Sequence, residues 1–210
     1  MSDYMVERTT GKATVRYSHG AATFHWLTVL LVLSQIYIGF RFGDLPKGLA
    51  RTELFTVHKT LGVAILILTL LRIGYRLINP PPPYPGDMPR WDRALAVWSH
   101  RIAYTALIIL PLTGLIAVSG RAKDGWVDLL WGLRLPALPL GDGELFGEVH
   151  EILVFVTIAL LVIHVGAAIY HHLILRDAAS GRMPPLPSTR RDPEAATASP
   201  PPPLPPLPPR

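Results

Sequence analysis

Long apolar runs alternate with shorter polar segments along most of this chain. Four runs are long enough to cross the hydrocarbon core of a bilayer, which takes about 20 residues at helical rise. They cover residues 21–40, 57–77, 102–118 and 152–170. Each run is continuously apolar rather than alternating, a pattern typical of transmembrane helices and not of barrel strands. The pattern therefore predicts an all-α integral membrane protein, folded as an up-and-down four-helix transmembrane bundle.

The polar segments divide the chain into three parts. Residues 1–20 are expected to form a loosely ordered polar segment, residues 21–177 the membrane domain, and residues 178–210 a disordered proline-rich tail. Within the membrane domain, helices are expected at about 21–40, 57–78, 98–118 and 149–175. The first run is interpreted as a retained helix, because polar residues precede it and no small-residue cleavage site closes it. The P-x-x-P tracts of the tail indicate either a solvated extension or a docking motif for a protein partner.

Composition and charge agree with a membrane protein. Half of the residues are apolar and 17% are charged, and the mean hydropathy is +0.32, which is too apolar for an ordinary soluble domain. Of the 20 Lys and Arg residues, 13 lie in the N-terminal segment, around the second loop and in the tail. The positive-inside rule then predicts that both termini are cytoplasmic. The basic charge thus reflects topology, with membrane lipid as the expected surrounding, and nucleic acid is not an expected partner.

The chain has no cysteine. This excludes disulfides, thiolate-bound iron–sulfur clusters and the C-x-x-C-H attachment of haem. The methionines all lie outside the apolar runs, at Met1, Met5, Met88 and Met183, so a thioether ligand inside the bundle is not expected. If the bundle holds a haem, its iron ligands are therefore expected to be histidines.

Four histidines near the ends of the predicted helices form two pairs. His150 and His164 are fourteen residues apart on the last helix, so they share a face and are separated by about 21 Å. With alternating topology, His58 lies at the external level of His150, and His25 lies at the internal level of His164. A single histidine at a span end is more often interfacial than functional. Two matched pairs at two depths favour metal ligands, because ionisable groups inside apolar spans are costly.

Glycine and arginine residues follow the histidines at the same stride. Gly39 and Gly114 each lie fourteen residues after a histidine, and Gly62 lies four residues after one. These glycines either leave room for a flat macrocycle or allow close helix contacts. Arg72, fourteen residues after His58, either pairs with a haem propionate at the internal level or snorkels to the membrane surface.

Two further histidines compete with His164 for an inner iron. His171 is on nearly the same helical face but about 31 Å from His150, at or past the headgroup boundary. His100 lies at the internal level and is expected to bind a propionate or a quinone rather than iron. Which of these three histidines holds an inner iron stays open.

At the external mouth, Lys59 either steers an anionic electron donor or is simply solvated.

Four segments carry motifs that are specific in combination: RYSHGAATFHWLTVLLV, VHKTLGVAILILTLLRIGYRL, WSHRIAYTALIILPLTGLI and VHEILVFVTIALLVIHVGAAIYHHLILRDAASGRMP. Over about residues 14–184 the chain resembles the bacterial cytochrome b561 family. The resemblance implies a four-helix protein of the bacterial inner membrane that carries two haem b groups and exchanges electrons with ubiquinone or another quinone. By motif match, the axial ligands would be His25, His58, His150 and His164. The family includes a superoxide oxidase, which makes superoxide one candidate for the external donor.

The leading hypothesis is a membrane dihaem cytochrome that moves electrons between an external donor and the quinone pool. One alternative is a haem-bearing anchor subunit of a larger hydrogenase or dehydrogenase, with a redox subunit as the donor. A second is a histidine-lined metal or proton transporter, which is less favoured because the apolar runs lack Asp and Glu. A third is a scaffold that recruits partners through the proline-rich tail.

Overall fold

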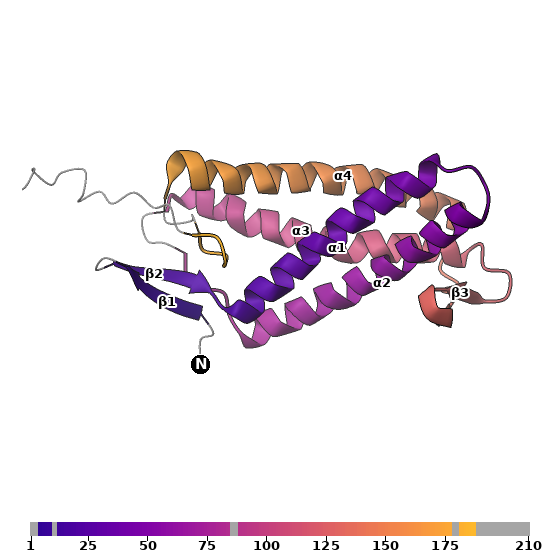
Figure 1. Cartoon of the computed structure of the whole chain (residues 1–210), viewed down its shortest axis with the longest axis horizontal. Helices are drawn as coiled ribbons and strands as arrows, with labels where there is room; N and C mark the ends of the chain where they lie inside the picture. The colour runs from indigo at the N-terminus through magenta and orange to yellow at the C-terminus, as the bar shows by residue number, and fades with distance from the viewer. Residues whose placement is uncertain (1–3, 10–11, 85–87, 178–180, 188–210) are drawn as a thin grey trace, which may run out of the picture.

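Four long helices build the molecule. The computed structural model describes residues 4–9, 12–84, 88–177 and 181–187. Its long helices are α1 (His19–Asp44), α2 (Leu49–Ile78), α3 (Arg90–Ser119) and α4 (Gly143–Ile169). They run alternately up and down along the long axis of the molecule (Figure 1). All four are long and apolar enough to cross a membrane, which confirms the predicted all-α transmembrane bundle.

The helices extend beyond their apolar runs. α1 begins after Ser18, whose hydroxyl accepts a hydrogen bond from the amide of Ala21 at 3.2 Å, and α4 begins after Asp142, which accepts from the amide of Glu144 at 2.7 Å. α2 begins at Leu49 instead of the predicted residue 57. Hydropathy identifies only the lipid-embedded part of a helix, so the polar first two turns of α2 were missed.

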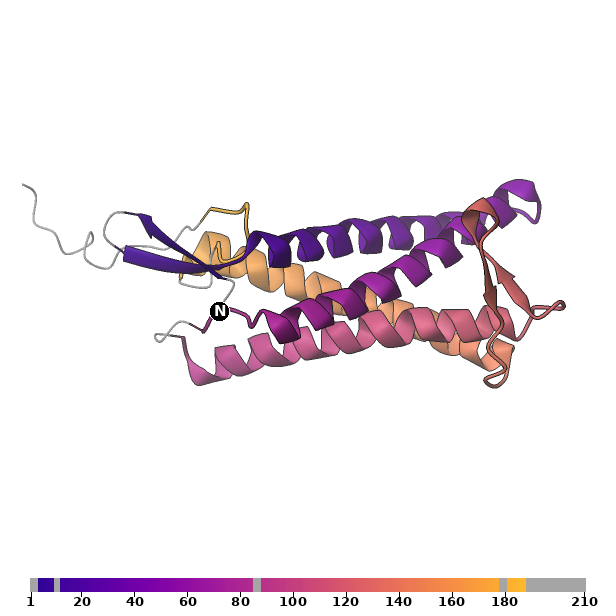
Figure 2. The ribbon, with the colours of Figure 1, turned by 90° about the horizontal axis from the view of Figure 1, so that it is seen from below.

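The four helices do not pack equally on one another. α1 packs along α2, α2 along α3 and α3 along α4, whereas α4 makes few close backbone contacts with α1 or α2. Figure 2, turned by 90°, shows from another side that the four helices run along the same long axis. The bundle therefore has a loosely packed interior between α4 and the α1–α2 pair.

At one end of the bundle, α3 and α4 cross with their backbones in contact. A Cβ atom on Gly120 would lie 2.7 Å from the Cα of Gly143, and a Cβ on Gly143 would lie 2.9 Å from the carbonyl oxygen of Ala117. Backbone atoms cannot turn away as a flexible side chain can. Glycine at both positions therefore permits the crossing.

We expect Gly143→Ala to lower the thermal stability of the purified protein, because the added methyl group forces α3 and α4 apart. Overpacking of this kind costs about 1–3 kcal/mol. Gly166→Ala, on the same helix but with open space at its Cβ position, is the matched control. Thermal melting of both variants checks the prediction. Equal melting temperatures for the two variants would contradict it.

The segment before α1 is a β-hairpin rather than the loosely ordered segment expected from its polarity. Strand β1 (Tyr4–Thr9) pairs antiparallel with β2 (Lys12–Tyr17), with Tyr4 opposite Tyr17. Valine, threonine and tyrosine are frequent in both strands, and these residues favour extended backbone. The end of the bundle beside this hairpin is called the hairpin end below (Figure 1).

The chain after α4 also folds back onto the hairpin end. Helix α4 continues into η2, a π-helical turn (Tyr170–Leu175). Farther on, the carbonyl of Arg182 accepts from the amide of Tyr17 at 2.9 Å, and the carbonyl of Pro184 accepts from the indole N–H of Trp26 at 2.6 Å. The first part of the predicted tail thus packs on the membrane unit. The predicted disorder and partner docking of the remaining tail concern residues 188–210, outside the described residues.

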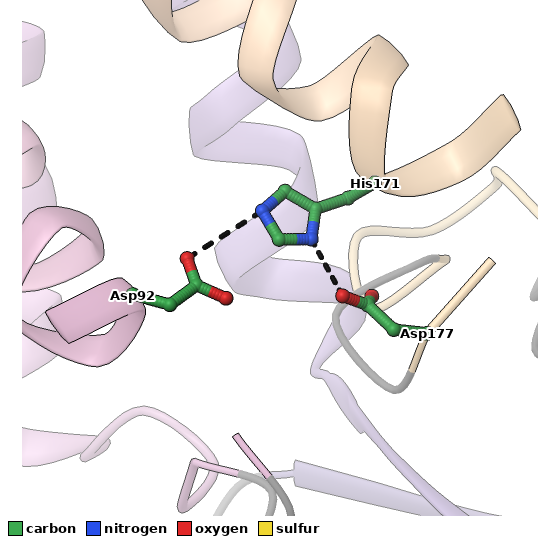
Figure 3. A group of neighbouring side chains, drawn as sticks. All are labelled: Asp92, His171 and Asp177. Carbon is green, nitrogen blue, oxygen red and sulfur yellow. Dashed lines mark hydrogen bonds and ion pairs between the residues drawn. The ribbon is translucent and has the colours of Figure 1, made fainter. Parts of the chain in front are cut away.

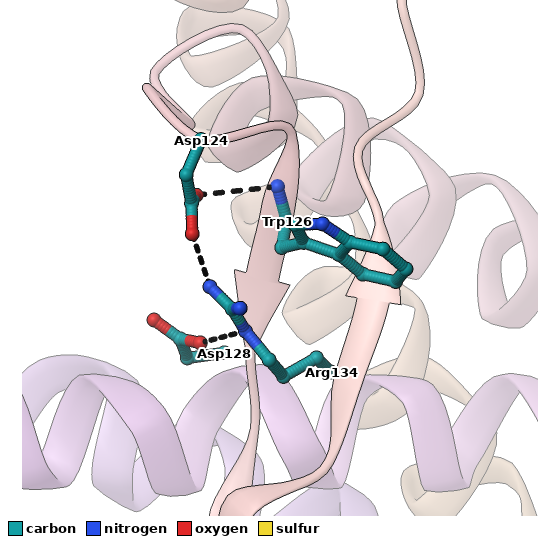
Figure 4. A network of polar contacts seen from close by, with 4 residues as sticks. All are labelled: Asp124, Trp126, Asp128 and Arg134. Carbon is teal, nitrogen blue, oxygen red and sulfur yellow. Dashed lines mark hydrogen bonds and ion pairs between the residues drawn. The ribbon is translucent and has the colours of Figure 1, made fainter.

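A small two-stranded cap covers the opposite end, called the β3–β4 end. It consists of β3 (Trp126–Asp128), a 3-10 turn η1 (Leu130–Gly132) and β4 (Arg134–Pro136). Arg134 donates hydrogen bonds to the carboxylates of Asp124 and Asp128 (Figure 4). The hydrogen bond from Arg134 lowers the pKa of Asp124 below its usual value. The amide of Leu130 donates to the Thr60 hydroxyl at 3.0 Å, which fastens the cap to α2.

Candidate functional site

Two pairs of imidazoles face one another inside the bundle. The His58 pair joins His58 on α2 to His150 on α4, with ring centroids 6.3 Å apart. The His25 pair joins His25 on α1 to His164 on α4, with ring centroids 6.5 Å apart. The His25 pair lies toward the hairpin end and the His58 pair toward the β3–β4 end. The structure therefore brings together both pairs of histidines that alternating topology and helical spacing had grouped.

The separation within each pair suits two ligands on opposite sides of one metal ion. A ligating nitrogen lies about 2.0 Å from the metal, and the centroid of its ring lies about 1 Å farther away. Two such rings on opposite sides of the metal therefore have their centroids about 6 Å apart. Both observed separations are close to this value. The two pairs thus fit bis-histidine coordination.

Both pairs also span the loosely packed part of the bundle. They bridge α1 to α4 and α2 to α4, and neither of these helix pairs is among the closely packed ones. A flat macrocycle needs such a space, because its plane lies between the two ligand-bearing helices. By contrast, α3 packs closely along α4. The helix spacing therefore favours a cofactor between α4 and the α1–α2 pair.

Hydrogen bonds around His150 fix its ring orientation. Its Nδ1 lies 2.9 Å from the carbonyl oxygen of Leu110, and the Thr113 hydroxyl donates to the same oxygen at 2.8 Å. A carbonyl oxygen only accepts, so Nδ1 carries the hydrogen and Nε2 keeps a free lone pair. Histidine ligands of metals commonly use this arrangement.

His58 lacks comparable partners. Within the described part of the chain neither of its ring nitrogens forms a hydrogen bond, and its Nδ1 is buried. A buried polar atom without a partner costs free energy and calls for an explanation. Coordination of a metal ion by this nitrogen would give it a partner. The main chain of His58 is held separately, because the side-chain amide of Gln35 donates to its carbonyl at 2.9 Å.

Two of the three predicted glycines, Gly39 and Gly114, lie against the His58 pair, and Gly62 lies against Gln35. A Cβ on Gly39 would lie 3.3 Å from the His58 ring, and one on Gly114 would lie 2.9 Å from the His150 ring. A Cβ on Gly62 would lie 3.4 Å from the amide nitrogen of Gln35. Gly39 and Gly114 thus make room for the imidazoles themselves.

Gln35 is a site residue that the sequence analysis missed. Its amide stands inside the first apolar run, where a polar side chain is costly. A glutamine inside an apolar run is therefore the sequence signal that could have identified this residue.

The hairpin end holds a third imidazole beside the His25 pair. The ring of His100 lies 5.6 Å from that of His164, centroid to centroid, and its Nδ1 donates to the carbonyl of Ala96 at 2.6 Å. The rings of His25 and His100 thus flank His164, whose nitrogens form no hydrogen bond among the described residues. His100 reaches His164 across the closely packed α3–α4 pair, which leaves less space there than between α1 and α4.

Arg72 lies against the His25 pair. Its Nη2 is 3.2 Å from the Nδ1 of His25, and its guanidinium lies over the ring of Tyr104 at 5.4 Å. Because a guanidinium only donates, Nδ1 accepts in this contact. A cavity opens here at the hairpin end, lined in part by Arg72, Arg76, His100, Tyr75 and Tyr104.

The last two predicted residues, His171 and Lys59, make their contacts with side chains outside the imidazole pairs. His171 contacts the carboxylates of Asp92 and Asp177 instead of His25 or His164 (Figure 3). The Nζ of Lys59 lies 5.4 Å from the ring centre of Phe55, toward the β3–β4 end.

Four membrane-spanning helices that bring two pairs of imidazoles together are the architecture of a membrane protein that can hold a metal cofactor. The sequence profile of prokaryotic cytochrome b561 matches residues 16–185, which is most of the membrane unit. The chain therefore belongs to the prokaryotic cytochrome b561 family. It is accordingly a haem-binding, multi-pass bacterial membrane protein of electron transport.

Curated relatives agree with this membership. Cytochrome b561 homolog 1 of Escherichia coli K12 is 30% identical over 177 residues, 81% of this chain and 97% of the relative. Cytochrome b561 homolog 2 of the same organism is 28% identical over 178 residues, 80% of this chain and 90% of the relative. The probable superoxide oxidase CybB of Yersinia pestis is 29% identical over 174 residues, 81% of this chain and 96% of the relative.

Proposed function

We propose that the protein is a dihaem b-type cytochrome that carries electrons across the bacterial inner membrane between an external donor and the quinone pool. The observation that carries this proposal is the presence of two imidazole pairs at two depths, both using α4. His58 and His150 hold one haem in this proposal, and His25 and His164 hold the other. Each bound haem supplies a one-electron carrier, and two imidazole ligands leave no open position for oxygen.

The protein's own groups prepare the ligands. The carbonyl of Leu110 keeps the hydrogen of His150 on Nδ1, which leaves Nε2 for iron. At the other pair, coordination through Nε2 of His25 would put a hydrogen on Nδ1, and the Arg72 N–H could then no longer donate to it. Arg72 would turn to the adjoining cavity, where its charge suits a haem propionate.

Charge supports an orientation with the hairpin end in the cytoplasm. Within the described ranges, 10 of the 17 Lys and Arg residues belong to segments at that end, as the positive-inside rule requires. The His58 pair would then be the external one and would receive electrons first. Lys59 lies beside it and would attract an anionic donor. The name of the Yersinia relative makes superoxide the donor to test first.

A reduction experiment tests the proposal. Purified protein from haem-replete cells is expected to hold two haem groups per chain with low-spin b-type absorption. Superoxide from xanthine oxidase should reduce the haem bands, and ubiquinone should reoxidise them. Superoxide dismutase, added first, should prevent the reduction.

Two results would oppose the proposal in different ways. A colourless protein would rule out the cytochrome function altogether. A dihaem protein that responds to quinol but not to superoxide would rule out superoxide as donor. It would favour the alternative of an anchor subunit that receives electrons from a redox protein.

A further inference from the structure

A second polar site lies at the hairpin end, apart from the imidazole pairs. It combines Asp92 from the first turn of α3, His171 from the π-helical turn η2, and Asp177 just beyond it (Figure 3). One potential metal-ligating atom from each residue lies within 4.8 Å of the others. Three separate segments thus converge with one imidazole and two carboxylates.

Asp92 is buried in a way that helix capping does not explain. The residue is 9% exposed, although it stands near the start of a helix, where an acidic side chain often caps the backbone. The N-cap here is Pro89, which has no N–H, and no side-chain cap forms. In the described part of the chain, the carboxylate forms no hydrogen bond. Within the described residues, its ion-pair contact is with the Nε2 of His171, 3.6 Å away. A buried carboxylate in this situation needs a compensating positive charge.

We propose that Asp92 and His171 bind a first-row divalent cation such as Zn²⁺. Two ligands about 2.1 Å from one tetrahedral ion are about 3.4 Å apart, close to the 3.6 Å between Asp92 Oδ1 and His171 Nε2. Mixed imidazole and carboxylate ligands suit Zn²⁺ better than Mg²⁺ or Ca²⁺, which prefer oxygen alone. Water completes the coordination.

Asp177 orients the histidine. Its Oδ2 lies 2.7 Å from the Nδ1 of His171, so it accepts the Nδ1 hydrogen and leaves the Nε2 lone pair toward Asp92. Carboxylates commonly hold metal-binding histidines in this way, and losing one costs about 10–100-fold in metal affinity. Asp177 is therefore a positioning residue for this site.

The cation site is distinct from the haem pairs. His171 is seven residues beyond His164, a helical distance of about 10 Å. A bound ion would connect the start of α3 to the chain just after α4. Because it would bind only the folded protein, it should raise the melting temperature. The proposal depends on neither the number of haems nor the identity of the electron donor.

Calorimetric titration tests the site on the full-length, haem-loaded protein after treatment with a chelator. We expect one Zn²⁺ ion to bind tightly per protein chain and to raise the melting temperature. MgCl₂ at the same concentration should show neither effect. Asp92→Asn and His171→Gln should each weaken Zn²⁺ binding at least tenfold. Asp177→Asn should weaken it by about 10–100-fold.

His172→Gln is the matched control, because it removes the neighbouring histidine of the same turn, and it should leave the Zn²⁺ affinity unchanged. The haem absorption of each variant shows whether it has folded. If the Asp92→Asn variant fails to fold, the comparison of His171→Gln with His172→Gln still tests whether His171 binds Zn²⁺. Undetectable Zn²⁺ binding by the unmodified protein would overturn the proposal. So would equal affinities for His171→Gln, His172→Gln and the unmodified protein.

Discussion

Replacing His164 by alanine is expected to reduce the haem content from two groups per chain to one and to stop reoxidation by quinone. His164 is the only proposed ligand of the inner haem on α4, and the rings of His25 and His100 flank it. The haem at the His58 pair should remain and should still be reduced from outside. A pyridine haemochrome assay against protein concentration gives the haem ratio, and stopped-flow absorption gives the reoxidation rate.

Two single variants make this prediction specific. His171→Ala should keep both haem groups, because His171 contacts Asp92 and Asp177 rather than the His25 pair. His100→Ala should also keep both, because His100 reaches His164 across closely packed helices. Loss of a haem in either variant, with retention in His164→Ala, would show that the inner ligand is assigned to the wrong residue.

The bundle and the histidine grouping could be predicted because both follow from regular geometry. Apolar runs of membrane length define helices in lipid, and a stride of fourteen residues returns to the same helical face. Alternating topology then determines which histidines share a depth. The observed groupings of His58 with His150 and of His25 with His164 follow from these three regularities.

Features outside the lipid were predicted less well. The hairpin of β1 and β2, the early start of α2 at Leu49 and the docking of residues 181–187 were all missed. Hydropathy carries no information about polar segments at a membrane surface. The docking in particular depends on contacts between residues more than 150 positions apart, such as Trp26 with Pro184.

The contacts around the site also include some that could be predicted from the sequence and some that could not. Gly39 and Gly114 could be predicted because each lies fourteen residues after a histidine. Their contacts with the imidazole rings do not follow from that spacing. The hydrogen bond from His150 to the carbonyl of Leu110 involves a backbone atom. Residue type alone cannot indicate such a partner.

The second large effect is expected from filling the space at Gly114. Its Cβ position lies 2.9 Å from the Cε1 of His150, so the side chain of Gly114→Leu would occupy the place of the imidazole. The His150 ring would then lose its hydrogen bond to Leu110 and its alignment with His58. We expect loss of the haem at the His58 pair, retention of the other, and loss of reduction by superoxide. Gly74→Leu, on a helix position with open space, should keep both haem groups. A full haem complement in Gly114→Leu would show that the close approach of α3 is not needed for ligation by His150.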